Sequence, residues 1–213
     1  MKGRVMAILI VGVILAAATQ VFAKKITENF EKGKLEDKWE IEGETQILGD
    51  KKHGGQKSLK ISANSKATFS FSDENKLAKV VIWVYDEGIT LNPGKPKETV
   101  IGGRWGVINV DGECFVHEIV WHKGLDGNEG YGWFVSTDPY DNSWSGVKRI
   151  KEWSKWEFDL FSDEDRHVIV NDSKESKIEW GKVYKGGITG VYFQVKSEKS
   201  GPLYVDDIEI DTK

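Results

Sequence analysis

Hydrophobic and polar residues alternate along most of the chain after residue 23, and this pattern predicts β-strands. In the segment 78–86, one face carries small and branched aliphatic residues, and the other carries Trp83 and Tyr85. Similar short segments recur between Gly- and Asp-rich turns, at 58–61, 67–71, 104–110, 114–121, 131–136, 156–160, 167–171, 190–196 and 204–210. No long stretch has a helical period. The pattern therefore predicts an all-β fold, a two-sheet antiparallel β-sandwich (jelly roll).

The segment Gly201–Ile210 predicts the last strand of this sandwich. Strict period two would place Asp206 on the same face as Tyr204, Ile208 and Ile210. A carboxylate that faces a core is costly unless it is hydrogen-bonded, paired or bound to a metal. We therefore expect Asp206 to mark a structurally organised point.

Residues 1–23 have the pattern of a secretory signal peptide. Lys2 and Arg4 precede an apolar run that ends at Ala18, and small residues occupy the positions before the expected cleavage site. An uncleaved membrane anchor is the alternative, because the apolar segment is almost long enough to span a bilayer. The prediction is a secreted protein, extracellular or periplasmic, with one domain at 24–213 and no membrane span in the mature chain.

Charge and cysteine content narrow the function classes. The net charge of −4 becomes −6 when Lys2 and Arg4 leave with the signal peptide, which argues against nucleic acid or anionic lipid as a partner. Cys114 is the single cysteine and cannot form an internal disulfide. On period two it shares a face with Val116 and Val120, so we interpret it as a buried apolar residue.

Three short motifs resemble β-jelly-roll carbohydrate-binding modules and concanavalin A-like extracellular sandwich domains. They are the Asn-Phe-Glu-Lys-Gly segment 29–33 followed by Trp39, the Gly-Gly turn that leads into Ser-Leu-Lys-Ile at 54–61, and the ending Tyr-Val-Asp-Asp-Ile-Glu-Ile at 204–210. They occur in the expected order at both ends of the mature chain, while roughly residues 75–185 show no such likeness. The resemblance implies the sandwich fold and a polysaccharide or glycan partner.

The same resemblance implies a structural Ca²⁺ where the first and last strands meet. The matching positions are Glu31 and Asp206 or Asp207, and backbone carbonyls of residues 55–57 are further candidate ligands. Oxygen ligands in a mixed shell suit Ca²⁺. The alternative is that Asp206 accepts hydrogen bonds from backbone N–H groups at a strand end. The four histidines show no spacing typical of zinc sites.

The chain contains 9 Trp, 6 Tyr and 9 Phe, and the core of one sandwich domain does not readily bury all of them. A Trp or Tyr ring offers a flat apolar face on which a sugar ring can stack. Alternation assigns one group to the core: Phe30, Trp39, Phe69, Phe71, Trp156, Phe158 and Phe193. A second group, with polar neighbours, is the candidate ligand-binding set: Trp83, Tyr85, Glu113, His117, Trp121, Tyr131, Trp133, Tyr140 and Trp144.

Part of this set lies in the segment 111–121. Period two places Glu113, His117 and Trp121 on one face and Glu118 on the other. This face is interpreted as a sugar-binding surface, as a catalytic acid–base pair of Glu113 and His117, or as an ordinary solvated strand. The segment 136–144, rich in turn-forming residues, predicts a loop that either borders a groove or is simply a long turn.

Three functions remain open on the sequence. The first is a secreted, non-catalytic glycan-binding domain that uses aromatic stacking. The second is a polysaccharide hydrolase or lyase on the same fold, although Glu113 and Glu118 point to opposite faces and cannot form the carboxylate pair of a glycosidase. The third is a cell-surface structural or adhesion domain whose aromatic residues all lie in the core or an interface.

Overall fold

The computed structural model describes residues 24–89, 100–121, 129–135, 138–161, 166–179 and 186–213. The predicted signal peptide lies outside them. All regular elements in these ranges are strands: β1 (Lys24–Glu28), β2 (Trp39–Glu42), β3 (Thr45–Leu48), β4 (Ser58–Ile61), β5 (Ser65–Ser70), β6 (Ala78–Asp86), β7 (Val100–Ile108), β8 (Cys114–Trp121), β9 (Glu129–Val135), β10 (Asp138–Lys148), β11 (Ser154–Asp159), β12 (His167–Val170), β13 (Ser173–Glu179), β14 (Gly190–Val195) and β15 (Leu203–Thr212). These segments contain no helix able to cross a membrane.

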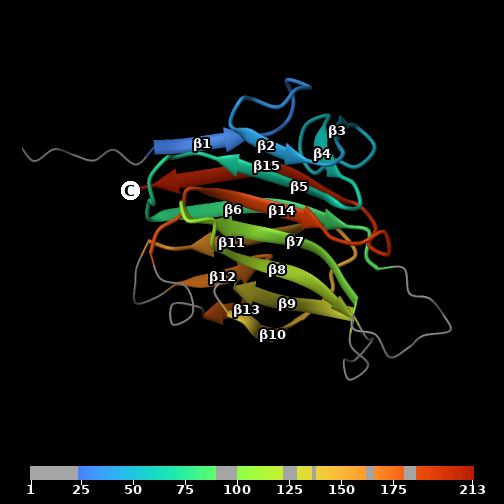
Figure 1. Ribbon diagram of the computed structural model, residues 1–213, viewed down its shortest axis with the longest axis vertical. Coiled ribbons are helices and arrows are strands. Elements are labelled where there is room, and N and C mark those ends of the chain that lie inside the picture. Colours follow the sequence, from blue (N-terminus) through green and yellow to red (C-terminus); the bar gives the residue numbers. More distant parts are fainter. Residues whose placement is uncertain (1–23, 90–99, 122–128, 136–137, 162–165, 180–185) are drawn as a thin grey trace, which may run out of the picture.

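The strands form two antiparallel sheets that overlap as layers in Figure 1. Sheet A has the order β13-β12-β11-β6-β15-β4-β3, and sheet B has the order β10-β9-β8-β7-β14-β5-β2. The long strand β15 pairs with β6 on one side, and on its other side with β4 at 203–205 and with β1 at 208–212. The first and last strands of the mature chain therefore meet, and the predicted two-sheet β-sandwich is confirmed.

The core lies between the sheets and follows the alternation of the strands. In β6, for example, buried and half-buried residues alternate from Ala78 to Asp86. Trp39 is partly buried and packs against the core. The other aromatic residues assigned to the core are buried as predicted: Phe30, Phe69, Phe71, Trp156, Phe158 and Phe193. Cys114 is a buried free thiol, which confirms its interpretation.

The register of β15 differs from strict period two because the strand contains a β-bulge. Asp206 lies opposite Trp83 and Glu209 opposite Val81, so two residues, Asp207 and Ile208, face the single residue between these partners. Asp207 adopts a positive φ of 43° at this bulge. The bulge shifts the parity of the strand. Val205, Ile208 and Ile210 belong to the core, whereas Tyr204 and Asp206 lie opposite outward-facing residues of β6.

The placement of Asp206 on the core face was therefore wrong. The segment 136–144 also differs from the prediction, because residues from Asp138 onward belong to β10 rather than to a loop. This strand lies at the edge of sheet B and its register shifts twice. An edge strand tolerates Pro139 and an irregular ladder, since one side needs no partner. Local turn signals could not show this.

Candidate functional site

Five rings gather on the outer face of sheet A, and we call this group the aromatic patch: His53, Trp83, Tyr85, Trp153 and Tyr204. The imidazole of His53 stacks on Trp83 with ring centroids 3.6 Å apart and planes 15° apart. Trp153 contacts both His53 and Tyr85 at 5.9 Å between centroids, and Tyr85 meets Tyr204 edge-on at 6.1 Å. Trp83, Tyr85 and Trp153 remain partly exposed. The patch is thus a continuous aromatic surface at the solvent boundary.

A hollow of about 310 Å³ lies beside the patch. Its lining combines one aromatic ring with an aliphatic residue and four charged side chains: Val81, Trp83, Lys155, Asp172, Asp207 and Glu209. His53, which stacks on Trp83, is not part of this lining. A bound molecule would find an apolar ring next to strong hydrogen-bond acceptors.

The loop 49–57 covers this end of sheet A, and Asp206 holds it there. One carboxylate oxygen of Asp206 accepts hydrogen bonds from the backbone N–H groups of His53 (3.0 Å) and Gly54 (3.2 Å), and the other accepts one from Asp207 (2.9 Å). Burial under the loop raises the pKa of Asp206 to about 6. The sequence correctly marked this carboxylate as an organised point, although on the other face.

Two further acids complete the attachment of the loop. Asp207 pairs with the imidazole of His53 at 2.8 Å. Glu31 accepts hydrogen bonds from the backbone N–H groups of Gln56 (2.7 Å) and Lys57 (3.0 Å), and these bonds lower its pKa. A Cβ at position 54 would lie only 2.5 Å from a carboxylate oxygen of Asp207, so a glycine there allows the close approach.

The three carboxylates predicted as calcium ligands therefore surround one loop. Glu31 and Asp206 accept hydrogen bonds from its backbone N–H groups, and Asp207 pairs with the imidazole of His53. Within the described ranges, no three His, Cys, Asp or Glu side chains gather closely enough to hold a metal ion. The contacts of Glu31 and Asp206 match the alternative in which these carboxylates accept hydrogen bonds from backbone N–H groups. A calcium site that uses mainly backbone carbonyls stays a prediction.

The structure corrects the proposed pairing of Glu113 and His117. His117 is fully buried against Phe115, Trp156 and Phe158, and burial lowers its pKa to about 3. Glu113 lies before β8, where it accepts a hydrogen bond from the side chain of Asn109 at 3.0 Å. A buried imidazole cannot contact a polysaccharide, so neither a ligand-binding nor an acid–base role for His117 is compatible with the fold.

Tyr131 is also a core residue rather than a ligand-facing one. Its side chain is fully buried, and its hydroxyl donates to a carboxylate oxygen of Asp86 at 2.9 Å and accepts from the N–H of Ile150 at 3.0 Å. Arg149 binds the other oxygen of Asp86 at 2.6 Å. These contacts satisfy a buried polar cluster and fix the chain after β10.

The remaining candidates have a described backbone but side chains outside the described set. Trp121 ends β8, Trp133 in β9 lies opposite His117 and Ser143, and Trp144 in β10 lies opposite Gly132. Tyr140 is in the irregular part of β10. Their role as ligand contacts stays a prediction, whereas Trp83 and Tyr85 belong to the aromatic patch.

The outer face of sheet B carries a feature that sequence reasoning missed, a buried ion pair between Arg104 of β7 and Glu118 of β8. Nε of Arg104 lies 2.5 Å from a carboxylate oxygen of Glu118, and the side chains are 6% and 1% exposed. Burial raises the pKa of Glu118, and the arginine opposes this shift. The sequence did place Glu118 on the face opposite His117. It could not identify the partner, because Arg104 lies 14 residues earlier in the chain.

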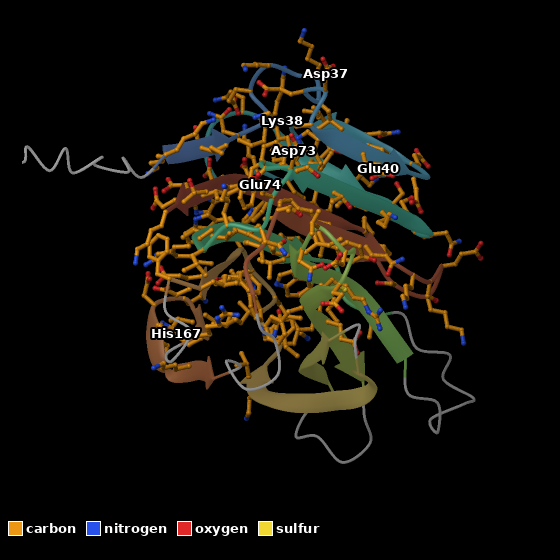
Figure 2. The ribbon with its side chains drawn as sticks, turned by 60° about the vertical axis from the view of Figure 1, so that its left-hand side comes forward. Asp37, Lys38, Glu40, Asp73, Glu74 and His167 are labelled. Atoms are coloured by element: carbon orange, nitrogen blue, oxygen red, sulfur yellow. The ribbon has the colours of Figure 1, made fainter. Side chains whose placement is uncertain are left out.

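A second hollow, of about 420 Å³, lies where β2 and β5 meet at one end of sheet B. Figure 2 shows Asp37, Lys38, Glu40 and Asp73 gathered there, with Glu74 nearby and His167 far away. The one Trp in its lining, Trp39, packs against Phe30, Phe69 and Phe193. The core therefore already uses the ring, and this hollow offers little for aromatic stacking.

Comparison with known proteins establishes the fold. The sequence matches no protein-family model and no curated protein. Among solved structures, the chain is similar to the cellulose induced protein Cip1, with 17% identity, a TM-score of 0.61, and 87% of this chain and 96% of Cip1 covered. It is also similar to the carbohydrate recognition domain of Emp47p, with 11% identity, a TM-score of 0.56, and coverage of 88% and 94%.

A third similar structure is domain 4 of AbnA, a GH43 extracellular arabinanase from Geobacillus stearothermophilus, solved in complex with arabinotriose. The identity is 15%, the TM-score is 0.52, and 89% of this chain and 93% of that domain are covered. Each of the three likenesses covers 87% or more of this chain, and so includes most of the middle for which the motifs gave no resemblance. The predicted jelly-roll sandwich fold is thus confirmed.

Proposed function

We propose that this protein is a secreted, non-catalytic carbohydrate-binding domain whose ligand occupies the hollow beside Trp83. The observation that carries this proposal is the hollow itself, where an outward-facing Trp ring adjoins Asp172, Asp207, Glu209 and Lys155. Two similar structures support the class of ligand, since one is a carbohydrate recognition domain and another was solved in complex with arabinotriose.

The lining suits a sugar residue chemically. The C–H groups of a sugar ring stack on the indole, while the carboxylates accept hydrogen bonds from hydroxyl groups and the ammonium of Lys155 donates one. A volume of 310 Å³ is at the lower end of the range for ligand pockets, about 300–1,000 Å³. We therefore expect the hollow to take one or two units of a chain whose remainder lies along the aromatic patch.

The charge of the lining gives the expected class of glycan. Three carboxylates face the hollow with one lysine, and Lys155 already pairs with Asp172 at 2.7 Å. A uronic acid would bring another negative charge close to these acids, and this repulsion disfavours binding. Neutral glycans are therefore the expected ligands. Binding without cleavage is proposed because the Glu113–His117 pair is not assembled.

The test is affinity electrophoresis of residues 24–213 through a panel of soluble neutral and acidic polysaccharides. We expect retardation by one or more neutral polysaccharides without their breakdown. Trp83→Ala should weaken binding by roughly tenfold, and Trp83→Phe should retain most of it, because the ring face is kept. Val110→Ala is the matched control, since Val110 is an exposed apolar residue away from the hollow.

Unchanged affinity in Trp83→Ala would remove the hollow from consideration. Retardation by acidic polysaccharides alone would contradict the charge argument. If no polysaccharide were bound, the structural or adhesion function would be favoured. Release of shorter products, by contrast, would show an enzyme.

Structural calcium is part of the same proposal and has a separate test. An ion bound by the carbonyls of residues 55–57 and by Glu31 would stabilise the loop 49–57 in addition to its N–H contacts. Thermal unfolding with calcium and with chelator measures this directly. A fall in Tm in chelator, reversed by Ca²⁺ and absent in Glu31→Gln, would support the ion. Identical Tm values would leave the loop to its hydrogen bonds alone.

A further inference from the structure

His53 contacts two of the residues that line the hollow beside the aromatic patch. Its imidazole stacks on Trp83 with ring centroids 3.6 Å and planes 15° apart, and its Nδ1 lies 2.8 Å from Oδ2 of Asp207. Trp83 and Asp207 both belong to the lining, whereas His53 does not. A residue outside the hollow therefore touches both the aromatic ring and one of the acceptors that a ligand would meet inside it.

The backbone that carries this imidazole is held independently of the ring. The N–H of His53 donates to Oδ2 of Asp206 at 3.0 Å, and the N–H of Gly54 donates to the same oxygen at 3.2 Å. Asp206 is 1% exposed. On its other side the imidazole meets the ring of Trp153 at 5.9 Å between centroids. The loop thus places the imidazole at a fixed point above Trp83.

The indole of Trp83 borders open space and has few contacts that could hold its orientation. Trp83 is partly exposed, and the hollow of about 310 Å³ lies beside it. Among the residues that the structure describes, His53 is the one whose ring contacts the indole. A side chain that borders a void lacks packing partners on that side. The stack with His53 is therefore the contact that can keep the indole in one orientation.

The pairing with His53 also fixes the carboxylate of Asp207. A carboxylate only accepts hydrogen bonds, so Nδ1 of His53 is the donor to Oδ2. The other oxygen, Oδ1, has no hydrogen-bond partner within the described part of the chain, and the side chain is 33% exposed. With Oδ2 held by the imidazole, Oδ1 is available as an acceptor for a hydroxyl group in the hollow.

We propose that His53 is a positioning residue for the ligand site, which holds the Trp83 ring ready for stacking and orients the carboxylate of Asp207. This inference rests on the proposed function of the hollow. Binding is tighter when the groups that contact the ligand already have their binding orientation, because binding then does not have to order them. If that orientation is populated about a tenth of the time without the imidazole, the affinity falls about tenfold.

Three substitutions separate the two contacts of the imidazole. His53→Ala removes both contacts. His53→Phe keeps a flat ring that can stack on Trp83 but offers no donor to Asp207. His53→Asn keeps a side-chain donor but has no ring. We expect the affinity to fall about tenfold in His53→Ala and about two- to fourfold in each of the other two, which therefore restore part of the loss.

Isothermal titration of residues 24–213 with arabinotriose, cellotriose and xylotriose measures these affinities. Lys52→Ala is the matched control, because Lys52 is an exposed neighbour in the same loop, and it should bind as the wild type does. Trp83→Ala, measured beside it, tests the hollow itself.

A measurement without ligand tests the positioning directly. The order parameter of the Trp83 indole N–H, identified as the signal that Trp83→Phe removes, should fall in His53→Ala and stay near the wild-type value in His53→Phe. Hydrogen exchange at the Gly54 amide should stay slow in both variants, because Asp206 still accepts this N–H. This exchange distinguishes a mobile ring from a detached loop.

The inference is overturned if His53→Ala binds as the wild type does, or if its indole stays as ordered. It is also overturned if Gly54 exchange accelerates in His53→Ala, since weaker binding would then reflect a detached loop. In each case the hollow remains the glycan site as long as Trp83→Ala weakens binding. If neither these probes nor the polysaccharide panel bind the wild type, the proposed function fails and the binding role of His53 fails with it, whatever the order parameter shows.

Discussion

Asp206 and Glu118 are two buried carboxylates on opposite outer faces of the same sandwich, and their partners differ. Asp206 is 1% exposed and accepts three backbone N–H groups, so both of its oxygens are occupied. Glu118 is 0% exposed and binds one arginine, with Oε1 left without a partner among the described residues. Two carboxylates that are equally buried can therefore differ in how many of their oxygens have a hydrogen-bond donor.

The difference indicates different roles for the two carboxylates. Asp206 attaches a loop to a sheet, a structural task that ends when its hydrogen bonds are made. Glu118 neutralises the buried Arg104 across two strands, and one of its oxygens is left without a donor among the described residues. His117, the neighbour of Glu118 on the core side, is a third case, because neither ring nitrogen has a partner in the described structure.

The largest expected effect comes from removing the carboxylate of Glu118. Glu118→Ala deprives the buried Arg104 of its paired charge, and we expect a loss of about 3–5 kcal/mol in the free energy of unfolding. Urea denaturation measures it. Glu42→Ala is the control, because Glu42 pairs with Lys66 on the same sheet but is 61% exposed, and it should cost less than about 1 kcal/mol. Equal losses in Glu118→Ala and Glu42→Ala would contradict the larger cost expected for a buried ion pair.

Asp206→Ala should have the next largest effect, about 3 kcal/mol, because it leaves three backbone N–H groups without an acceptor. The loss should be local, since the loop 49–57 can reach water. Amide hydrogen exchange at His53 and Gly54 should therefore accelerate more than exchange in the core strands. Asp73→Ala, at an exposed turn, should change neither quantity. Slow exchange that persists at these two amides would show that other contacts hold the loop.

His117 should make stability depend on pH. Its folded pKa of about 3 lies below its ordinary value of 6.5, so the unfolded chain takes up a proton that the folded chain does not. The free energy of unfolding should therefore fall as pH falls through this window, by about 2 kcal/mol between pH 7 and pH 5. Urea denaturation of the wild type and His117→Leu should show this slope reduced in the variant. Parallel slopes would mean that other groups dominate.

The smallest expected effect concerns the aromatic patch. His53→Ala removes the imidazole stacked on Trp83 but keeps the backbone N–H that Asp206 accepts, so the loss should be about 1 kcal/mol or less. Denaturation measures the loss, and a change in Trp fluorescence reports the newly uncovered ring. Lys52→Ala, an exposed neighbour in the same loop, is the control. A loss as large as that of Asp206→Ala would show that the ring, rather than the carboxylate, attaches the loop.

Much of the fold was predictable because alternation is a local property. The segment 78–86 showed its core face and its aromatic face directly. The aromatic residues that were assigned to the core followed the same rule, with Trp39 only partly buried. The prediction of which face a residue occupies was wrong where one extra residue in a strand reversed the alternation. The bulge at Asp207 moved Tyr204 and Asp206 to the outer face, and no pattern in Tyr-Val-Asp-Asp-Ile announces an inserted residue.

The candidate site was only partly predictable. Trp83 and Tyr85 were identified by their outward parity, but His53, Trp153 and the acids of the hollow come from other strands and turns. His117 was assigned to a ligand face because its neighbours are polar, whereas period two cannot tell which of two mixed faces is buried. The ion pair of Arg104 and Glu118 depends on the pairing of β7 with β8, which is set by register across a turn.

The sequence by itself determined the strands, the alternation of the core and the sandwich class, because each depends on residues within a few positions of one another. The tertiary structure decided which face each mixed strand buries, where β15 bulges, and which distant side chains meet beside Trp83 or Glu118. These outcomes depend on register and layer packing between strands far apart in the chain. The pairing of distant strands decides which polar groups are buried and which find hydrogen-bond partners, and a local sequence pattern carries no information on that pairing.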